Sequence, residues 1–194
     1  MGALLGFITS FVSAFQKRGG TDELLHELLV GKQSEDFINQ VADLAMKMVK
    51  TVRDGFWVVV DYSKSLTEMI SAGNYDWVNS DISEKNFPVN GKGQIESNIE
   101  LIHYGKSMSS EDVIQDMETK GLRPATLSEL LAFGKSYPDK QREFPIVALG
   151  SVWRNLFGTR FVAFLSSFDS KRLLHLCIWG GGWVESCRFA AVRK

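Results

Sequence analysis

The sequence predicts an α+β fold in which helices come first and antiparallel strands come last. Residues 1–54 carry helical spacing and helix caps, and capping boxes recur in the middle of the chain. After Gly134 the sequence changes to short runs of β-branched and aromatic residues. Such segregation is typical of α+β domains, whereas parallel α/β sheets alternate helix and strand. We expect a helical N-terminal segment over residues 1–50 and one domain over 51–194.

Caps and breaks divide the N-terminal segment into helices. Thr21 follows the break at Gly19-Gly20 and is a good N-cap, and Ser34 is a second cap. The helix after Ser34 carries an apolar stripe with i, i+4, i+7 and i+11 spacing, formed by Phe37, Val41, Leu44 and Met48. A stripe of this kind packs in a core or against a second subunit. We therefore expect attachment or self-association through these helices.

The apolar stretch Gly2–Phe15 has two open interpretations. It is too short to span a membrane, and it lacks the basic start and cleavage site of a signal peptide. It is then either a buried or partner-facing helix or a segment that lies on a membrane surface. Localisation stays undefined, with the cytoplasm as the default because only two cysteines occur.

Turn and cap residues place the next elements. The turn Asp54-Gly55 precedes a strand over Phe56–Val60, and Ser65 to Glu68 form a capping box for a short helix ending near Gly73. Polar residues and glycines over 74–97 predict a long irregular loop.

Alternation, caps and stops define the middle of the domain. Alternation over Ile99–Tyr104 predicts a strand. A helix follows from Ser109 or Ser110 to Gly121, and a capping box at Thr126 opens another helix that ends at Gly134.

Four strands are expected after that helix, over Phe144–Leu149, Arg160–Leu165, Arg172–Trp179 and Cys187–Val192. In the third strand one face carries Leu174, Leu176 and Ile178 and is core. The opposite face carries Leu173, His175, Cys177 and Trp179, and it is either exposed for contact or buried as well. A hairpin centred on Gly182 would set Cys177 opposite Cys187.

The residue content excludes several classes of function. A net charge of -1 excludes a polybasic nucleic-acid binder. The basic excess over residues 121–194 either faces an anionic ligand or folds against the acidic residues of 55–120. No nucleotide-binding, metalloprotease or nucleophile-elbow motif occurs, and the three histidines are scattered. We expect no catalytic residues, no metal and no cofactor. The two thiols form a redox pair or are inert apolar residues.

The order of elements in the last third resembles a known family. It runs from the capped helix at Arg123–Leu130 through the strand at Phe144–Trp153 and Trp183 to the closing strand Arg188–Arg193. This order resembles a C-type lectin-like domain, with a weaker extension back to Phe56. More narrowly, it is similar to the variable proteins of diversity-generating retroelements in archaea and uncultured bacteria.

The resemblance implies recognition without chemistry. In that family, adenine-specific mutagenesis rewrites codons near the 3′ end of the gene, and the new side chains bind ligand on a rigid lectin-like scaffold. The ligand would be an unknown macromolecule or cell-surface group. The ligand-binding residues expected here are Asn155, Phe157, Ser167, Asp169, His175, Cys177, Trp179, Gly180, Gly181, Gly182, Val184, Ser186 and Cys187.

Two alternatives stay open beside this interpretation. The chain lacks the Glu-Pro-Asn or Gln-Pro-Asp triplet of calcium-dependent lectins, so we expect no calcium-dependent sugar binding, although a lectin-like domain with one fixed ligand remains an alternative. The fold also resembles formylglycine-generating enzymes, in which Cys177 and Cys187 would be the reactive pair.

Tryptophans at 153, 179 and 183 would form a stiff floor for a binding surface, and the glycines at 180–182 form either its shallow tip or a plain turn.

Overall fold

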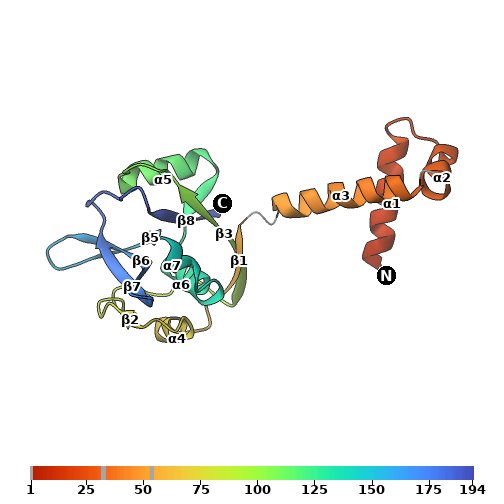
Figure 1. Cartoon of the computed structure of the whole chain (residues 1–194). Coiled ribbons are helices and arrows are strands. Elements are labelled where there is room, and N and C mark those ends of the chain that lie inside the picture. Colours follow the sequence, from red (N-terminus) through yellow and green to blue (C-terminus); the bar gives the residue numbers. More distant parts are fainter. Residues whose placement is uncertain (1, 32–33, 53–54) are drawn as a thin grey trace. The chain divides into compact units, whose positions relative to one another are not determined.

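The chain forms two compact units, Met1–Val52 and Arg53–Lys194. The structure is a computed structural model that describes residues 2–31, 34–52 and 55–194, with side chains for 9–31, 34–43 and 55–194. Over these residues the protein has seven helices and one eight-stranded, mostly antiparallel open sheet (Figure 1). The predicted α+β fold is confirmed, with helices first and four strands last, but the first four strands alternate with helices between residues 56 and 124.

The first unit consists of three helices, α1 (Gly2–Gln16), α2 (Asp22–Val30) and α3 (Ser34–Val52). Thr21 caps α2 as predicted, because its hydroxyl accepts a hydrogen bond from the Leu24 N–H at 3.3 Å. None of the side chains described in this unit is buried. Among the helices of the described ranges, none has both the length and the apolar character needed to cross a bilayer.

Two sequence predictions fall on positions that the structure leaves undescribed. Asp54, in the expected turn, lies outside the described residues. The side chains of Leu44 and Met48, half of the apolar stripe, lie outside them as well. Phe37 and Val41 are described and are half-buried.

The second unit contains all the strands. Its helices are α4 (Leu66–Ala72), α5 (Ser110–Thr119), α6 (Leu127–Ser136) and α7 (Lys140–Glu143). Its strands are β1 (Phe56–Asp61), β2 (Trp77–Val78), β3 (Gln94–His103), β4 (Leu122–Pro124), β5 (Ile146–Arg154), β6 (Arg160–Phe168), β7 (Lys171–Ile178) and β8 (Arg188–Arg193). Ser65, Ser109 and Thr126 cap α4, α5 and α6, as their sequence patterns predict.

The sheet has the order β1-β3-β8-β5-β6-β7-β2, and β4 also pairs with β8. Two pairings are parallel, β5 with β8 and β2 with β7, and the others are antiparallel. The closing strand β8 therefore lies inside the sheet, between β3 on one side and β4 and β5 on the other.

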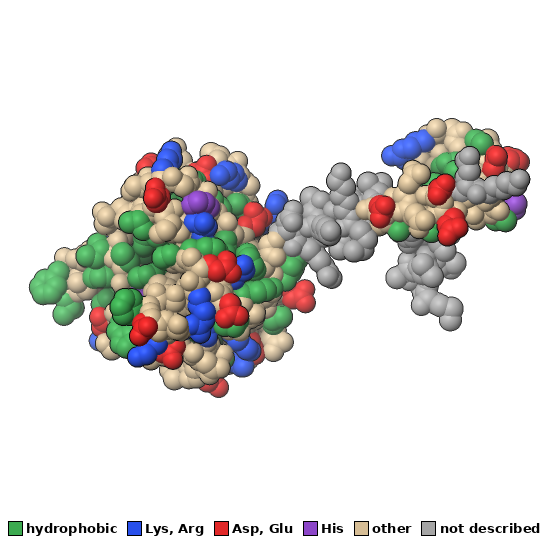
Figure 2. Space-filling model, in the orientation of Figure 1, with side chains coloured by type: hydrophobic (Ala, Val, Ile, Leu, Met, Phe, Trp, Pro, Cys, Tyr) green, Lys and Arg blue, Asp and Glu red, His purple; other side chains and the backbone are tan. Residues whose placement is uncertain are grey.

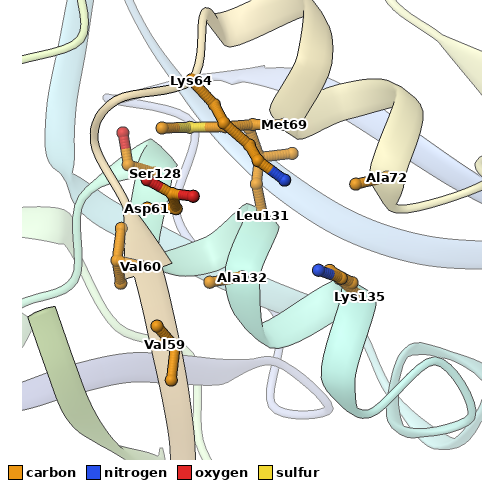
Figure 3. Close-up of a pocket in the computed structure, with 10 residues that line it drawn as sticks. All are labelled: Val59, Val60, Asp61, Lys64, Met69, Ala72, Ser128, Leu131, Ala132 and Lys135. Atoms are coloured by element: carbon orange, nitrogen blue, oxygen red, sulfur yellow. The ribbon is translucent and has the colours of Figure 1, made fainter. Parts of the chain in front are cut away.

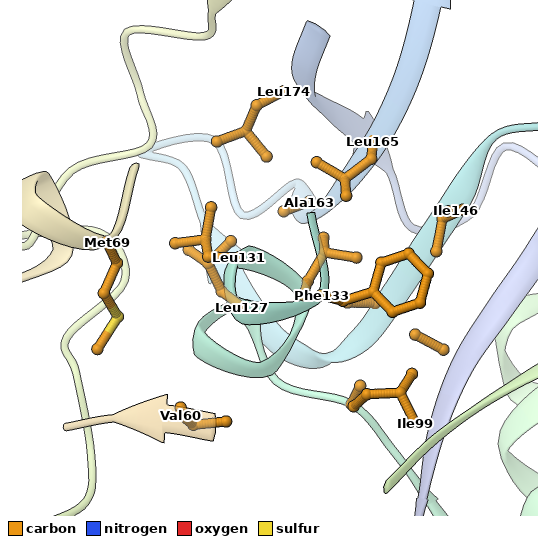
Figure 4. Close-up of a cluster of buried hydrophobic side chains, with 14 of the residues drawn as sticks. Val60, Met69, Ile99, Leu127, Leu131, Phe133, Ile146, Ala163, Leu165 and Leu174 are labelled. Atoms are coloured by element: carbon orange, nitrogen blue, oxygen red, sulfur yellow. The ribbon is translucent and has the colours of Figure 1, made fainter. Parts of the chain in front are cut away.

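The sheet has a hydrophobic cluster on each face. On the first, which we call the α6 face, Phe133 of α6 packs against Ile99, Ile146 and Leu165 (Figure 4). On the opposite face, which we call the α5 face, Val113 and Met117 of α5 pack against residues of β5, β6 and β8. Both helices are amphipathic, and each buries its apolar stripe on the sheet.

Three local expectations differ from the structure. The predicted loop over 74–97 contains the two-residue strand β2, and β3 begins at Gln94 rather than near Ile99. The hairpin centred on Gly182 is wrong, because β7 pairs with β6 and β2 whereas β8 pairs with β3, β4 and β5. The segment between them, residues 179–187, instead crosses the α5 face, where two buried tryptophans hold it.

Candidate functional site

Strand β7 separates core side chains from accessible ones by simple alternation. Leu174 is buried on the α6 face, and Leu176 packs against the same cluster. Leu173, His175 and Cys177 point to the α5 face and are only half-buried. The sequence predicted this alternation and left open whether the second face is exposed; the structure leaves it partly accessible. The prediction that Ile178 belongs to the core face is wrong, because Ile178 lies at the end of β7 and is 51% exposed.

Three rings line the accessible part of the α5 face. The His175 ring lies 5.2 Å from Phe164 of β6 and 4.7 Å from Trp77 of β2, measured between centroids. Trp77 reaches this position because β2 pairs in parallel with β7, setting Trp77 beside Leu173. We call Trp77, His175 and Phe164 the aromatic row. Trp77 is 45% exposed, so the aromatic row is available for contact.

Two titratable side chains in this part of the face, His175 and Cys177, are neutral near neutral pH. Burial lowers the pKa of His175, which favours the neutral imidazole. Burial also raises the pKa of the Cys177 thiol, which keeps it protonated. An uncharged aromatic surface favours contact with apolar or weakly polar groups over strongly charged ones.

Two tryptophans anchor the segment that follows β7. The Trp179 indole N–H donates to Glu111 Oε1 at 2.5 Å, and the Arg160 guanidinium lies 4.7 Å from the Trp179 ring centroid. The Ser110 hydroxyl donates to the Trp179 carbonyl at 2.7 Å and accepts from the Trp183 indole N–H at 2.9 Å. Both rings are buried, so the backbone of the segment is fixed at 179 and 183.

Exposed residues occupy the positions between and beyond these anchors: Gly180, Gly181, Gly182, Val184, Glu185 and Ser186. A Cβ at Gly180 would meet nothing within 4 Å, and one at Gly181 would meet only the Ile178 carbonyl at 3.6 Å. Gly182 has φ +70°, a conformation that side chains rarely adopt. Only one of the three glycines is therefore required by the backbone.

Other predicted site residues lie at two different ends of β6. Asn155 and Phe157 are in the β5–β6 turn, beside the Arg160 end of the strand. Ser167 and Asp169 are at the opposite end, where Asp169 forms the tight β6–β7 turn with φ 48°. The seven-residue step from Arg160 to Ser167 spans about 23 Å. This step separates Ser167 and Asp169 from Asn155 and Phe157. Ser167 pairs with Arg172 near the Leu173 end of β7, but alternation sends its side chain to the α6 face, where its hydroxyl donates to the Arg142 carbonyl at 3.5 Å.

Burial removes two further residues from the contact surface. Trp179 is 6% exposed and Cys187 is 5% exposed, so both support the surface from below. The cysteines are free, and they do not face each other on paired strands. Sequence reasoning missed Trp77, because the parallel β2–β7 pairing joins segments about a hundred residues apart. It also missed Phe164, which the antiparallel β6–β7 pairing sets opposite His175.

A depression with a mixed lining lies elsewhere, between β1, α4 and α6 (Figure 3). Lys64 and Lys135 stand near its opening, and its floor includes Met69 and Leu131. Its volume of about 40 Å³ holds a few water molecules and no larger ligand. Among the described side chains, no group of three His, Cys, Asp or Glu residues could hold a metal ion.

Comparison of the chain with protein-family models, curated proteins and solved structures gives no match. Function is therefore inferred from the arrangement of the side chains themselves.

Proposed function

We propose that this protein binds a macromolecular or cell-surface ligand through the accessible part of the α5 face. The observation that carries the proposal is the alternation in β7, which sends Leu173, His175 and Cys177 outward beside Trp77 while their neighbours enter the core. The exposed residues of 180–186 extend the same face. The protein would act by recognition and not by catalysis.

The division between fixed and replaceable residues supports this proposal. Trp179 and Trp183 are buried and hydrogen-bonded to α5, so they hold the surface in place. Val184 and Ser186 are exposed, and Gly180 and Gly181 have space for a side chain. A rigid support beneath replaceable side chains is the arrangement that adaptable binding surfaces use.

We further propose that the domain is a C-type lectin-like variable protein of a diversity-generating retroelement. The support is the resemblance in the last third of the chain, together with the position of the replaceable residues shortly before the closing strand β8. Under this proposal the diversified residues are His175, Cys177, Gly180, Gly181, Val184 and Ser186, whereas Ser167 and Asp169 belong to the scaffold. The bound ligand would differ from variant to variant, and nucleic acid is not expected among the ligands.

The oxidase alternative has less support from the same geometry. A reactive cysteine is a thiolate, and thiolates form where the pKa is lowered. Burial raises the pKa of both Cys177 and Cys187, and Cys187 is almost fully covered. We therefore keep recognition as the proposed function.

Sequencing of the gene locus tests the retroelement assignment. We expect a near-copy of the 3′ coding end beside a reverse transcriptase gene, with differences at adenines of the copy. A locus without such a repeat would contradict diversification and leave a lectin-like domain with one fixed ligand.

A library experiment tests the binding surface directly. Random residues at 173, 175, 177, 180, 181, 184 and 186 should give folded variants, from which binders to a purified test protein can be selected. The matched library randomises exposed positions of β1 and β3, such as Trp57, Val59, Ile95 and Glu96. Equal yields of binders from both libraries would contradict the proposed site.

A further inference from the structure

The turn between β5 and β6 presents two apolar side chains to solvent. Leu156 is 102% exposed and Phe157 is 92% exposed. Figure 2 shows hydrophobic side chains at the tip of this projecting hairpin, which Figure 1 places at the edge of the Arg53–Lys194 unit. Single exposed apolar residues are common on proteins, but two adjacent, fully exposed ones on a projection indicate a contact site.

The turn that carries these side chains is well ordered by its own hydrogen bonds. Asn155 Oδ1 accepts from the backbone N–H groups of Phe157 and Thr159, both at 3.0 Å. The Gly158 N–H donates to the Asn155 carbonyl at 3.0 Å, and Gly158 has φ +79°. The side chain of Asn155, predicted to bind ligand, is thus occupied within the turn. Its role is to hold Leu156 and Phe157 in place.

The hairpin is basic as well as apolar. From Ile146 to Phe168 the only charged residues are Arg154 and Arg160, with no Asp or Glu. Arg160 is paired with Glu111 at 3.0 Å, whereas Arg154 is exposed and contacts the Gly158 carbonyl at 3.5 Å. An apolar tip with an available cation at its base is complementary to a surface that is apolar inside and anionic outside.

We propose that this hairpin tip inserts into the surface of an anionic lipid bilayer. Leu156 and Phe157 enter the boundary between headgroups and acyl chains, and Arg154 contacts lipid phosphate. Binding of this kind combines buried apolar area with attraction to anionic lipid. Val152 and Ile178, both exposed near the base of the hairpin, add apolar contact as the tip enters.

The size of the tip favours a bilayer over a protein partner. A specific protein interface needs roughly 1,000 Å² of buried surface, and two side chains supply only a fraction of that area. A bilayer has no such minimum, because it takes up apolar side chains one at a time. The proposal is independent of the ligand-binding face, which is formed by β7 and the segment after it.

A fluorescent label at the tip tests the proposal on the full chain. Phe157→Cys in a Cys177→Ser background is labelled with the environment-sensitive dye NBD, since the remaining Cys187 is buried. With phosphatidylcholine vesicles rich in phosphatidylglycerol, we expect a blue shift and a brighter signal. The matched control is Phe168→Cys, an exposed aromatic at the other end of β6, whose label should not respond.

Vesicle flotation of the unlabelled protein gives the second measurement. Leu156→Ser with Phe157→Ser should weaken partition about tenfold or more, and Phe168→Ser should leave it unchanged. Partition that persists in the double variant, or that occurs without a shift at position 157, would show that another part of the chain binds the vesicles and would overturn the proposal. No partition at all would also overturn it and would assign the tip to a protein contact.

Discussion

The two units differ most in what their apolar side chains do. In Arg53–Lys194, residues such as Leu130 and Phe133 are fully buried between α6 and the sheet. In Met1–Val52, by contrast, Leu24 is 49% exposed and Val30 is 69% exposed, and no described side chain is buried. Helices gain most of their stability in proteins from burying an apolar face. The second unit therefore contains its own stabilisation, and we expect the first unit to bury its apolar side chains against an external surface.

The strongest test of this difference is the molecular mass in solution. We expect the full chain to have at least twice the mass of its 21.7 kDa monomer, because contact between copies covers the apolar residues of the first unit. A chain that starts at Arg53 should be monomeric. Light scattering measures both. Equal monomeric masses would contradict self-association and would leave a membrane or another protein to cover the first unit.

Truncation of apolar side chains should destabilise the two units by different amounts. Phe133→Ala should lower the free energy of unfolding by about 3–5 kcal/mol, because it leaves a cavity among fully buried residues. Leu24→Ala in α2 should change it by about 0.5 kcal/mol or less. Chemical denaturation followed by circular dichroism measures both. A similar loss from the two variants would mean that the first unit also has a core.

Replacing a buried tryptophan beneath the proposed binding surface should reduce stability nearly as much. Trp183→Ala should cost roughly 3 kcal/mol, since its buried ring packs on Phe189 and its N–H bonds to Ser110. His175→Asn, in the accessible row, should cost far less. Thermal melts give the order. A larger drop in melting temperature for His175→Asn than for Trp183→Ala would mean that His175 belongs to the scaffold and Trp183 to the surface.

The pH dependence of stability should also separate the two units. The buried carboxylate of Glu129 loses solvation, but its ion pair with Arg123 and its bonds to Thr126 outweigh this and lower its pKa. Its stabilisation is thus present above the unfolded value of about 4.3 and is lost as the pH falls through the folded value. Acid titration of the melting temperature should be shallower for Glu129→Gln. Glu27→Gln, at an exposed position of α2, should follow the wild-type curve.

The smallest effect concerns the glycines of the binding face. Gly182→Ala should cost about 1 kcal/mol because of the left-handed backbone, whereas Gly181→Ser should be nearly neutral. Melting temperatures of the two variants provide the comparison. Equal losses would show that the whole glycine run is a structural turn and not part of a replaceable surface.

Local chemistry made much of the fold predictable. Ser65, Ser109 and Thr126 begin helices because their side chains satisfy N–H groups three residues away, which the sequence displays directly. The alternation in β7 likewise follows from the geometry of a single strand. The incorrect prediction of a hairpin at Gly182 arose because this segment is determined by long-range contacts. Its true path is set by contacts of Trp179 and Trp183 with α5, about seventy residues earlier in the chain.

The proposed binding surface on the α5 face was predictable where it depends on local sequence pattern. His175, Val184 and Ser186 could be named from the pattern of their own segment, whereas Trp77 could not. Its position depends on a two-residue parallel strand with no sequence signature of its own. Ser167 was grouped with these residues because it is near in sequence, but alternation along β6 turns its side chain to the opposite face of the sheet, where it bonds to Arg142.

The central position of β8 has a consequence for gene expression. This strand follows the replaceable segment in the chain and pairs with β3, β4 and β5. A stop codon or frameshift within codons 173–186 therefore removes the strand that joins the two halves of the sheet. The truncated product would expose the unpaired edges of β3 and β5 and would be prone to aggregation and proteolysis. If this segment is diversified as proposed, variants with an interrupted reading frame would fail to fold, whereas variants with exchanged side chains would keep the sheet.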